Sequence, residues 1–352
     1  MSLVYTFPTN VTMETATQEY VIEHEKFIGE EIMPFTESMT QRVQWDELDN
    51  ERGMTAPSNL KSDPKIDLRP GSKLREYKPI PFKETDVVTE DELLEARAYG
   101  TLGGVVSLHE IVGRVIRSRS DKTFIRCEWL RWQTLQGEFT INENGVYVHE
   151  TFPVQTYDAL VDWDDRANAV PLQDDNAVAM MFDGTGASPE GAIAYLNQKT
   201  LNWRLENTNP EDLAGYRTDN TTLTFDLELM NKIAIRRGTP QYKLYNKGYH
   251  DREGVFTKFI DDGNVVVVGN RGSQKVGDFN MTPSFHRIKN GLPAPGFFNV
   301  LEVNGKGNPG VVEVSAADLG TGRNPSIANT GGVYGGTRLK FPRSVIKMVV
   351  KH

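Results

Sequence analysis

The sequence lacks the features that mark several large classes of protein. It contains one cysteine, Cys127, so no disulfide can form within the chain and a reducing compartment is favoured. No apolar run approaches the roughly 18 residues that a membrane-spanning helix needs. Residues 1–11 also lack the basic start and apolar core of a signal peptide. We therefore expect no membrane partner and no secreted, disulfide-stabilised domain.

Motifs for catalysis and metal binding are also missing. The 6 histidines include no pair spaced four residues apart, and there is no second cysteine, so no zinc site with neighbouring ligands is expected. No G-x-S-x-G nucleophile motif occurs. Residues Gly305–Gly310 match G-x-G-x-x-G, but a strand-like run follows them and Pro309 removes one N–H, so we interpret them as a surface turn. We expect no enzyme activity, no catalytic residue, no cofactor and no metal.

The composition is acidic and rather poor in apolar residues. A net charge of −9 argues against a protein that wraps nucleic acid through its overall field. Hydrophobic residues make up 38% of the chain, beside 31 glycines and 18 prolines, which favours a globular protein with long loops and extended arms. Acid pairs such as Asp174-Asp175 are expected to be solvated loop residues without a catalytic role.

The stretch Ser120–Val154 carries the clearest local prediction. Ile125, Trp129 and Trp132 recur at helical spacing, which predicts an amphipathic helix. This spacing assigns both tryptophans to the core rather than to a stacking platform for single-stranded nucleic acid. Ser120 is the expected N-cap, because its hydroxyl can accept a free backbone N–H.

A β-hairpin is expected directly after this helix. Gly137 follows the last periodic residue and suits a left-handed C-cap. Phe139 and Ile141 then alternate with polar residues up to Asn144-Gly145, a dipeptide typical of the turns that join antiparallel strands. Cys127 lies on the apolar side of the helix and is expected to be buried.

Other elements follow from similar patterns. Capping boxes at Thr89–Glu92 and Ser107–Glu110 predict two helix starts before Ser120. A helix is expected over Pro189–Thr208. Continuous or alternating apolar residues predict strands at Asn264–Gly269, Val311–Val314 and Val345–Val350. Glycine and proline recur from Asn270 to Gly336, which is therefore expected to be rich in loops.

Two segments near the N-terminus are expected to reach away from the body. Residues 1–31 are acidic and weakly helical, and read as an arm. The prolines between 57 and 81 exclude a helix and a central strand, and so long a loop is usually functional or engaged with another chain. We expect its basic residues to contact an acidic surface of a neighbouring copy, the arm among them. The residues concerned are Lys61, Lys65, Arg69, Lys73 and Arg75 on the loop, and Glu14, Glu19 and Glu23 on the arm.

The order of these features resembles one protein family. The wording LxGxFTINxxGVxVxxxF within 120–154 is similar to the spine helix and following strands of the lambda-type major capsid proteins of tailed bacteriophages. Four further segments fit the same order: PFTESMTQRVQWDEL, YKPIPFKETDVVTEDEL, RRGTPQYKLY and DDGNVVVVGN. No single motif is diagnostic, but their order and spacing together are.

The resemblance implies an α+β fold of the Hong Kong 97 type. Its parts would be an N-terminal arm, a long hairpin called the E-loop that crosses the adjacent subunit, a peripheral domain with the spine helix, and an axial domain. On this sequence the expected boundaries are 1–35 for the arm, 36–88 for the E-loop and its strands, 89–160 for the peripheral domain, 161–340 for the axial domain and 341–352 for a C-terminal strand.

The resemblance also implies a function. The chain would be a coat protein that assembles in the bacterial cytoplasm into hexamers and pentamers of an icosahedral phage head around double-stranded DNA. Expected partners are further copies of the chain, portal, scaffolding and decoration proteins, and non-specifically held DNA. Two alternatives remain at this point: a β-rich tail or carbohydrate-binding module, and a hydrolase that uses scattered carboxylates. The sequence gives neither the triangulation number nor the host.

Overall fold

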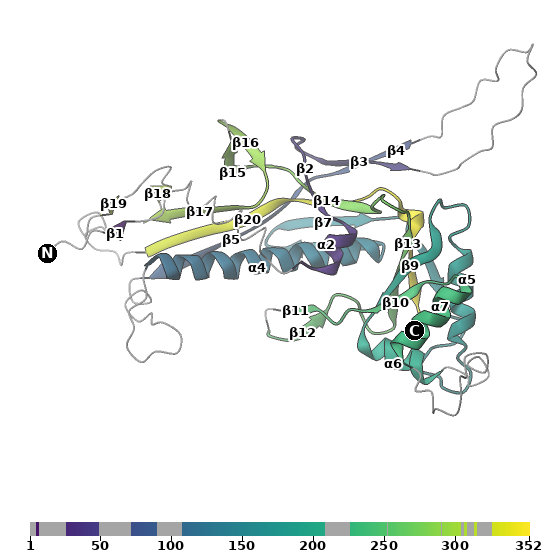
Figure 1. The fold of residues 1–352 in the computed structure, drawn as a ribbon. Coiled ribbons are helices and arrows are strands. Elements are labelled where there is room, and N and C mark those ends of the chain that lie inside the picture. The colour runs from purple at the N-terminus through teal and green to yellow at the C-terminus, as the bar shows by residue number, and fades with distance from the viewer. Residues whose placement is uncertain are drawn as a thin grey trace, which may run out of the picture.

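The computed structural model describes residues 5–6, 26–48, 72–89, 108–207, 226–251, 253–289, 291–303, 306–307, 313–314 and 326–352. Two sheets organise these residues. A long helix, α4 (Leu108–Leu135), runs beneath a six-stranded sheet, and a five-stranded sheet with three helices lies at one end (Figure 1). The architecture is α+β, as the sequence predicts.

Helix α4 is longer than the sequence predicts. It begins at Leu108, within the second capping box, and continues through Ser120 without a break. The prediction that Ser120 caps a helix is therefore wrong: its side chain is buried in the middle of α4. The end is as expected, because Gly137 has a φ of 105°, a backbone conformation that favours glycine.

The hairpin after α4 is confirmed. Strand β6 (Glu138–Glu143) pairs antiparallel with β7 (Val146–Thr151). Asn144 and Gly145 have φ values of 50° and 79°, which a two-residue turn of the primed type requires. Phe139 and Ile141 are buried, so this face of the hairpin joins the core.

The six-stranded sheet covers α4. Its order is β18-β17-β20-β14-β2, with β5 paired along β20 as well. The bounds are β2 Phe35–Glu37, β5 Ile80–Thr89, β14 Gly277–Met281, β17 Phe298–Val303, β18 Lys306–Gly307 and β20 Ser326–Leu339.

The expectation of loops between Asn270 and Gly336 is wrong at β20, the longest strand described in the chain. Its glycines are there because neighbours crowd the backbone. A Cβ at Gly332 would meet the carbonyl oxygen of Phe82, and one at Gly335 would meet that of Asn280. A glycine in the sequence can therefore indicate a strand whose backbone is approached closely by its neighbours, and does not always indicate a turn.

The five-stranded sheet has the order β10-β9-β13-β21-β8. Its strands are β8 Gln155–Asp158, β9 Ser188–Leu196, β10 Gln241–Leu244, β13 Asn264–Asn270 and β21 Val345–Val349. The buried strands expected at 264–269 and 345–350 are thus confirmed. The expected helix over Pro189–Thr208 is wrong in its first half, which forms β9 between β10 and β13. Only Gln198–Glu206 is helical (α6), with the Asn197 side chain accepting from the Thr200 N–H.

Shorter elements complete the described chain. Helices α5 (Pro171–Met180) and α7 (Leu227–Arg237) lie with α6 on the five-stranded sheet (Figure 1). Helix α2 (Ile28–Ile32) contacts α4. The remaining strands form two-stranded pairs: β1 Tyr5–Thr6 with β19 Glu313–Val314, β3 Val43–Leu48 with β4 Ser72–Tyr77, β11 Gly248–His250 with β12 Phe256–Lys258, and β15 Pro283–Lys289 with β16 Leu292–Pro295.

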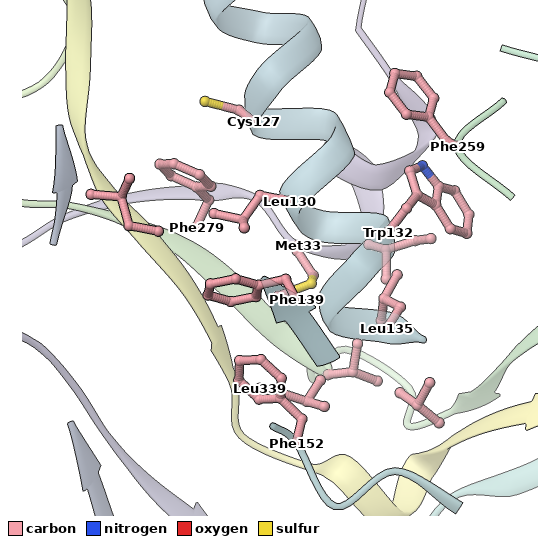
Figure 2. Packing of buried hydrophobic residues seen from close by; sticks show 14 of the residues in the cluster. Met33, Cys127, Leu130, Trp132, Leu135, Phe139, Phe152, Phe259, Phe279 and Leu339 are labelled. Atoms are coloured by element: carbon pink, nitrogen blue, oxygen red, sulfur yellow. The ribbon is translucent and has the colours of Figure 1, made fainter. Parts of the chain in front are cut away.

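Apolar side chains of α4 form the centre of the larger core. Figure 2 shows buried side chains on both sides of this helix: Cys127 and Leu130 lie on one side, and Trp132 lies on the other beside Phe259. Trp132 and Cys127 have no exposed surface, and Trp129 is partly buried against the same cluster. Both tryptophans therefore belong to the core, as their spacing predicts. Burial raises the pKa of the Cys127 thiol to about 12, which leaves it an unreactive packing residue.

Sheet pairing divides the chain differently from the expected domain boundaries. Residues 277–339 contribute β14, β17 and β20 to the six-stranded sheet, although the expected axial domain spans 161–340. The C-terminal strand β21 pairs between β13 and β8 in the five-stranded sheet. The chain thus leaves the first sheet after β5, enters the second at β8, and returns to the first between β13 and β21.

Candidate functional site

The base of the β3–β4 hairpin is fixed in the core. Trp45 stacks on Phe152 with ring centroids 5.9 Å apart and meets Tyr77 edge-on at 5.9 Å. The Tyr77 hydroxyl donates to the Thr337 carbonyl of β20 at 2.8 Å. Burial raises the pKa of this phenol, so it remains a donor at any physiological pH. From this anchor β3 and β4 point away from the body (Figure 1).

Two of the basic residues singled out in the sequence lie on β4. Arg75 Nε is 2.7 Å from Glu47 Oε2, and its Nη1 donates to the Thr151 carbonyl at 3.1 Å. Arg75 therefore stabilises the hairpin within its own chain. Lys73 pairs in register with Glu47 and is exposed, and among the described residues it has no ion pair within 4.0 Å. Of the two described residues from the predicted basic set, Lys73 is therefore the one that can contact another chain.

The other predicted contact residues lie outside the part of the chain that the structure describes. Lys61, Lys65 and Arg69 of the loop lie outside the described residues, and so do Glu14, Glu19 and Glu23 of the arm. Their role between subunits stays a prediction.

A buried carboxylate joins three parts of the fold, and the sequence analysis did not single it out. Glu128 Oε1 accepts hydrogen bonds from the Gly29 N–H at 2.8 Å, Trp132 Nε1 at 2.6 Å and the Tyr245 hydroxyl at 2.7 Å. Gly29 belongs to α2, Trp132 to α4, and Tyr245 follows β10 of the five-stranded sheet. Glu128 is thus a joint between the N-terminal segment, the long helix and the second sheet.

The charge of this joint is balanced nearby. Arg131 Nη1 lies 3.5 Å from Glu128 Oε2, and neither side chain is exposed. The Arg131 guanidinium also lies over the Phe35 ring, 4.1 Å from its centroid. Burial, and then the charge of Glu128, raise the pKa of the Tyr245 phenol, so Tyr245 stays protonated and donates.

A second buried network crosses the five-stranded sheet. Asp175 of α5 pairs with Arg204 of α6 at 2.7 Å and accepts from the Tyr242 hydroxyl of β10. Asp174 accepts from Tyr157 at 2.7 Å and from Trp163 Nε1 at 2.8 Å. The expectation that Asp174 and Asp175 are solvated loop residues is wrong, because both are buried on a helix and fully engaged in packing α5 and α6 on the sheet.

The part of the chain that the structure describes offers little for chemistry. It contains no group of three or more His, Cys, Asp or Glu side chains placed to hold a metal ion. A small cavity between α5, α6, α7 and β10 is lined by Asp175, Arg204 and Tyr242, which already bond to one another. No helix among the described residues is long and apolar enough to cross a membrane.

Solved structures with a similar fold identify the fold of this chain. The chain is similar to the putative capsid protein of a prophage of Escherichia coli CFT073, with 11% identity and a TM-score of 0.57 over 99% of both chains. It is also similar to a phage-related protein of Bordetella bronchiseptica RB50, with 10% identity and a TM-score of 0.55 over 99% of this chain and 98% of the other. No curated protein sequence matches the chain. At these identities the likeness concerns the fold, which is the Hong Kong 97-like capsid fold.

The family follows from the sequence itself. A profile of the family described as phage major capsid protein E matches residues 12–285, which is most of the chain. The chain belongs to this family, and it is a coat protein of a bacteriophage virion.

Proposed function

We propose that copies of this chain assemble into hexamers and pentamers of an icosahedral phage head that encloses double-stranded DNA. The observation that carries the proposal is the β3–β4 hairpin, whose base is anchored by Trp45 and Tyr77 while its strands leave the body (Figure 1). A projecting hairpin with few contacts to its own core gains stability when a neighbouring subunit covers it. Family membership and capsid fold support the same role.

The chain is a structural protein in this proposal and carries no enzyme activity. The buried acids are bonded to tryptophan, tyrosine and arginine partners that hold helices on sheets, so the geometry gives them a packing role. Portal, scaffolding and decoration proteins would be its partners, and assembly would take place in the cytoplasm of the host. DNA would be held weakly and without sequence preference, since the net charge of the chain is −9.

The parts of the subunit would divide as follows. Residues 1–35 form the arm and 36–88 the E-loop with its strands. Residues 89–160 form the peripheral domain except for β8, which belongs to the five-stranded sheet, and their helix α4 packs beneath the sheet to which 277–339 add strands. The five-stranded sheet and its helices form the axial domain, and β21 ties the C-terminus into it.

Particle mass tests the proposal. Purified protein is passed over a sizing column with light scattering at increasing concentration, alone and with the other head proteins, and then imaged in negative stain. We expect closed particles of megadalton mass. A protein that stayed monomeric under all these conditions would contradict the proposal, and small defined oligomers that bind oligosaccharide would favour the carbohydrate-binding alternative.

A further inference from the structure

Arg338 of β20 contacts the chain on both sides of the segment that leads into the β3–β4 hairpin. Its Nη2 donates to the Thr36 hydroxyl of β2 at 3.1 Å, and its Nη1 donates to the Gln44 carbonyl of β3 at 3.2 Å. Residues 38–42 connect β2 to β3 between these two contacts. One guanidinium group therefore ties the start of the hairpin to the strand that precedes it.

The guanidinium of Arg338 is itself held in one orientation by a buried carboxylate. Asp278 of β14 is the in-register partner of Arg338, and it accepts from Nε at 2.6 Å and from Nη2 at 2.8 Å. The Asp278 side chain is only 4% exposed, so these bonds are shielded from water. Two bonds to one carboxylate fix the plane of the guanidinium, which leaves Nη1 directed at β3.

The two residues before Arg338 hold the other strand of the hairpin. The Tyr77 hydroxyl of β4 donates to the Thr337 carbonyl at 2.8 Å. A Cβ at Gly336 would meet that hydroxyl, so the Tyr77 ring can lie there only because residue 336 is glycine. Three consecutive residues of β20 thus contact both strands of the hairpin at its base.

These hydrogen bonds set the direction of the hairpin, which apolar packing does not. Burial of Trp45 and Tyr77 keeps the hairpin attached, but the hydrophobic effect has no direction. Hydrogen bonds weaken steeply when donor and acceptor leave their line, so the bond to Gln44 resists tilting. The ladder that Gln44 belongs to is six residues long on β3. At about 3.4 Å per residue, a tilt of about 10° at its base would displace its end by roughly 3–4 Å.

We propose that Arg338 is a positioning residue, which sets the direction in which β3–β4 leaves the body (Figure 1). Contacts that repeat between copies need a defined geometry, and a hairpin free to tilt would let shells close at several diameters. Arginine suits this role because its donors lie in one fixed plane, whereas a lysine has one nitrogen and cannot span Asp278 and Gln44. This inference rests on the proposed assembly and assigns the control of hairpin direction to a residue outside the hairpin.

Spin-label distances in the dissociated subunit test the positioning itself. Labels are attached at Leu74→Cys on β4 and Tyr147→Cys on β7, both exposed positions, while the native Cys127 is buried and stays unlabelled. We expect one narrow distance distribution with Arg338 present. With Arg338→Lys the distribution should widen by roughly 3–4 Å, the displacement that a tilt of about 10° produces. The lysine keeps a positive charge beside Asp278, so the subunit should still fold.

Lys340→Met is the matched control for Arg338→Lys. Lys340 pairs with the same Asp278 carboxylate at 2.7 Å, from two residues further along β20, and its ammonium group bonds to nothing on the described β2 and β3. Its loss should leave the label distances unchanged. Thermal unfolding of both variants shows whether their losses of stability are similar. Equal widening in the two variants, or none with Arg338→Lys, would overturn the inference.

Particle diameter tests the consequence for assembly. Unlabelled Arg338→Lys and Lys340→Met subunits are assembled and imaged in negative stain. We expect the control to form shells of the wild-type diameter, and Arg338→Lys to form shells of several diameters or none. Uniform shells of wild-type diameter from Arg338→Lys would overturn the inference. Wild-type protein that forms no particles would count against the proposed function, while the label distances would still decide whether Arg338 fixes the hairpin.

Discussion

The Glu128 carboxylate accepts the backbone N–H of Gly29, 99 positions earlier in the chain, at 2.8 Å. A Cβ at Gly29 would lie 2.5 Å from Glu128 Oε2, so the close approach requires glycine there. This contact fastens the last part of the arm, helix α2, onto α4. Glu128 Oε1, which accepts from Gly29, also accepts from the Tyr245 hydroxyl, so the N-terminal segment and the second sheet share one acceptor.

Loss of the Glu128 carboxylate should destabilise the subunit strongly. Glu128→Ala leaves three donors without their acceptor and Arg131 buried without its counter-charge. We expect the free energy of unfolding of the dissociated subunit to fall by about 3–5 kcal/mol. Urea unfolding followed by tryptophan fluorescence measures it. Glu143→Ala, which removes the exposed partner of Arg126, is the control and should cost at most about 1 kcal/mol. Equal losses would contradict the assigned role.

Two glycine-to-alanine variants should change stability in opposite directions. Gly29→Ala forces its methyl group against the buried carboxylate and should cost about 1–3 kcal/mol. Gly113→Ala lies within α4, where an added Cβ meets nothing within 4 Å, and should stabilise by about 0.5–1 kcal/mol because alanine favours the helix. Thermal unfolding of both variants beside the wild type measures the difference. A neutral Gly29→Ala would show that the two segments separate easily.

Local sequence patterns correctly predicted the features whose backbone conformation depends on residues close by in the sequence. The spacing of Ile125, Trp129 and Trp132 predicted the helix, and Asn144-Gly145 predicted the turn, because both depend on the backbone within a few residues. The prediction that Ser120 caps a helix was wrong because the local sequence around a serine does not show whether the serine begins a helix or lies inside one. The preceding Arg119 is buried and lies within 3.5 Å of Glu84 and 3.2 Å of Asp86 on β5, partners that a local pattern does not contain.

The joint at Glu128 could not be predicted for the same reason. Its partners come from α2 and from the segment after β10, and only folding brings them together. A charged residue within a helix is normally solvated, so pattern alone places Glu128 and Arg131 on the surface. The one local signal was the four-residue spacing of Glu128 from Trp132, whose indole N–H needs an acceptor when it is buried. The glycines of β20 misled similarly, since their crowded neighbours lie on β5 and β14.

Acid should weaken one contact in a definable way. Partial burial raises the pKa of Asp262, but hydrogen bonds from Lys258 and Lys199 outweigh this and lower it below the usual range. The contribution to stability is therefore present above the ordinary pKa of about 4 and is lost as the pH falls through the lower folded pKa. We expect the difference in Tm between wild type and Asp262→Asn to shrink between about pH 5 and about pH 2. A difference that stayed constant would contradict the assignment.

Mature particles should not be covalently cross-linked. Of the three loop lysines in the sequence analysis, the structure describes Lys73, and its paired strand β3 contains no asparagine to which the lysine could be joined. We expect a single band near 39.5 kDa after particles are boiled in detergent and reductant. A ladder of larger species that survives reduction would show that a lysine joins another subunit.

The basic loop should contribute to assembly through charge, and Lys73 is the residue to change. Arg75 is unsuitable as a test because its reversal would break the internal pair with Glu47. Lys73→Glu should leave the Tm of the dissociated subunit within about 2 °C of wild type, since Lys73 is exposed. An exposed ion pair contributes only about 0.2–1 kcal/mol, but it recurs at every subunit contact, so the concentration needed for assembly should rise.

Salt separates this charge effect from a change in shape. Added salt screens exposed pairs, so the wild-type threshold should rise with ionic strength and approach that of Lys73→Glu. Lys73→Gln, which removes the charge without reversing it, should lie between the two at low salt. Light scattering during assembly gives all three thresholds. If Lys73→Glu assembled at the wild-type concentration across the whole salt range, the loop would dock without this charge, and the coat-protein assignment would be unaffected.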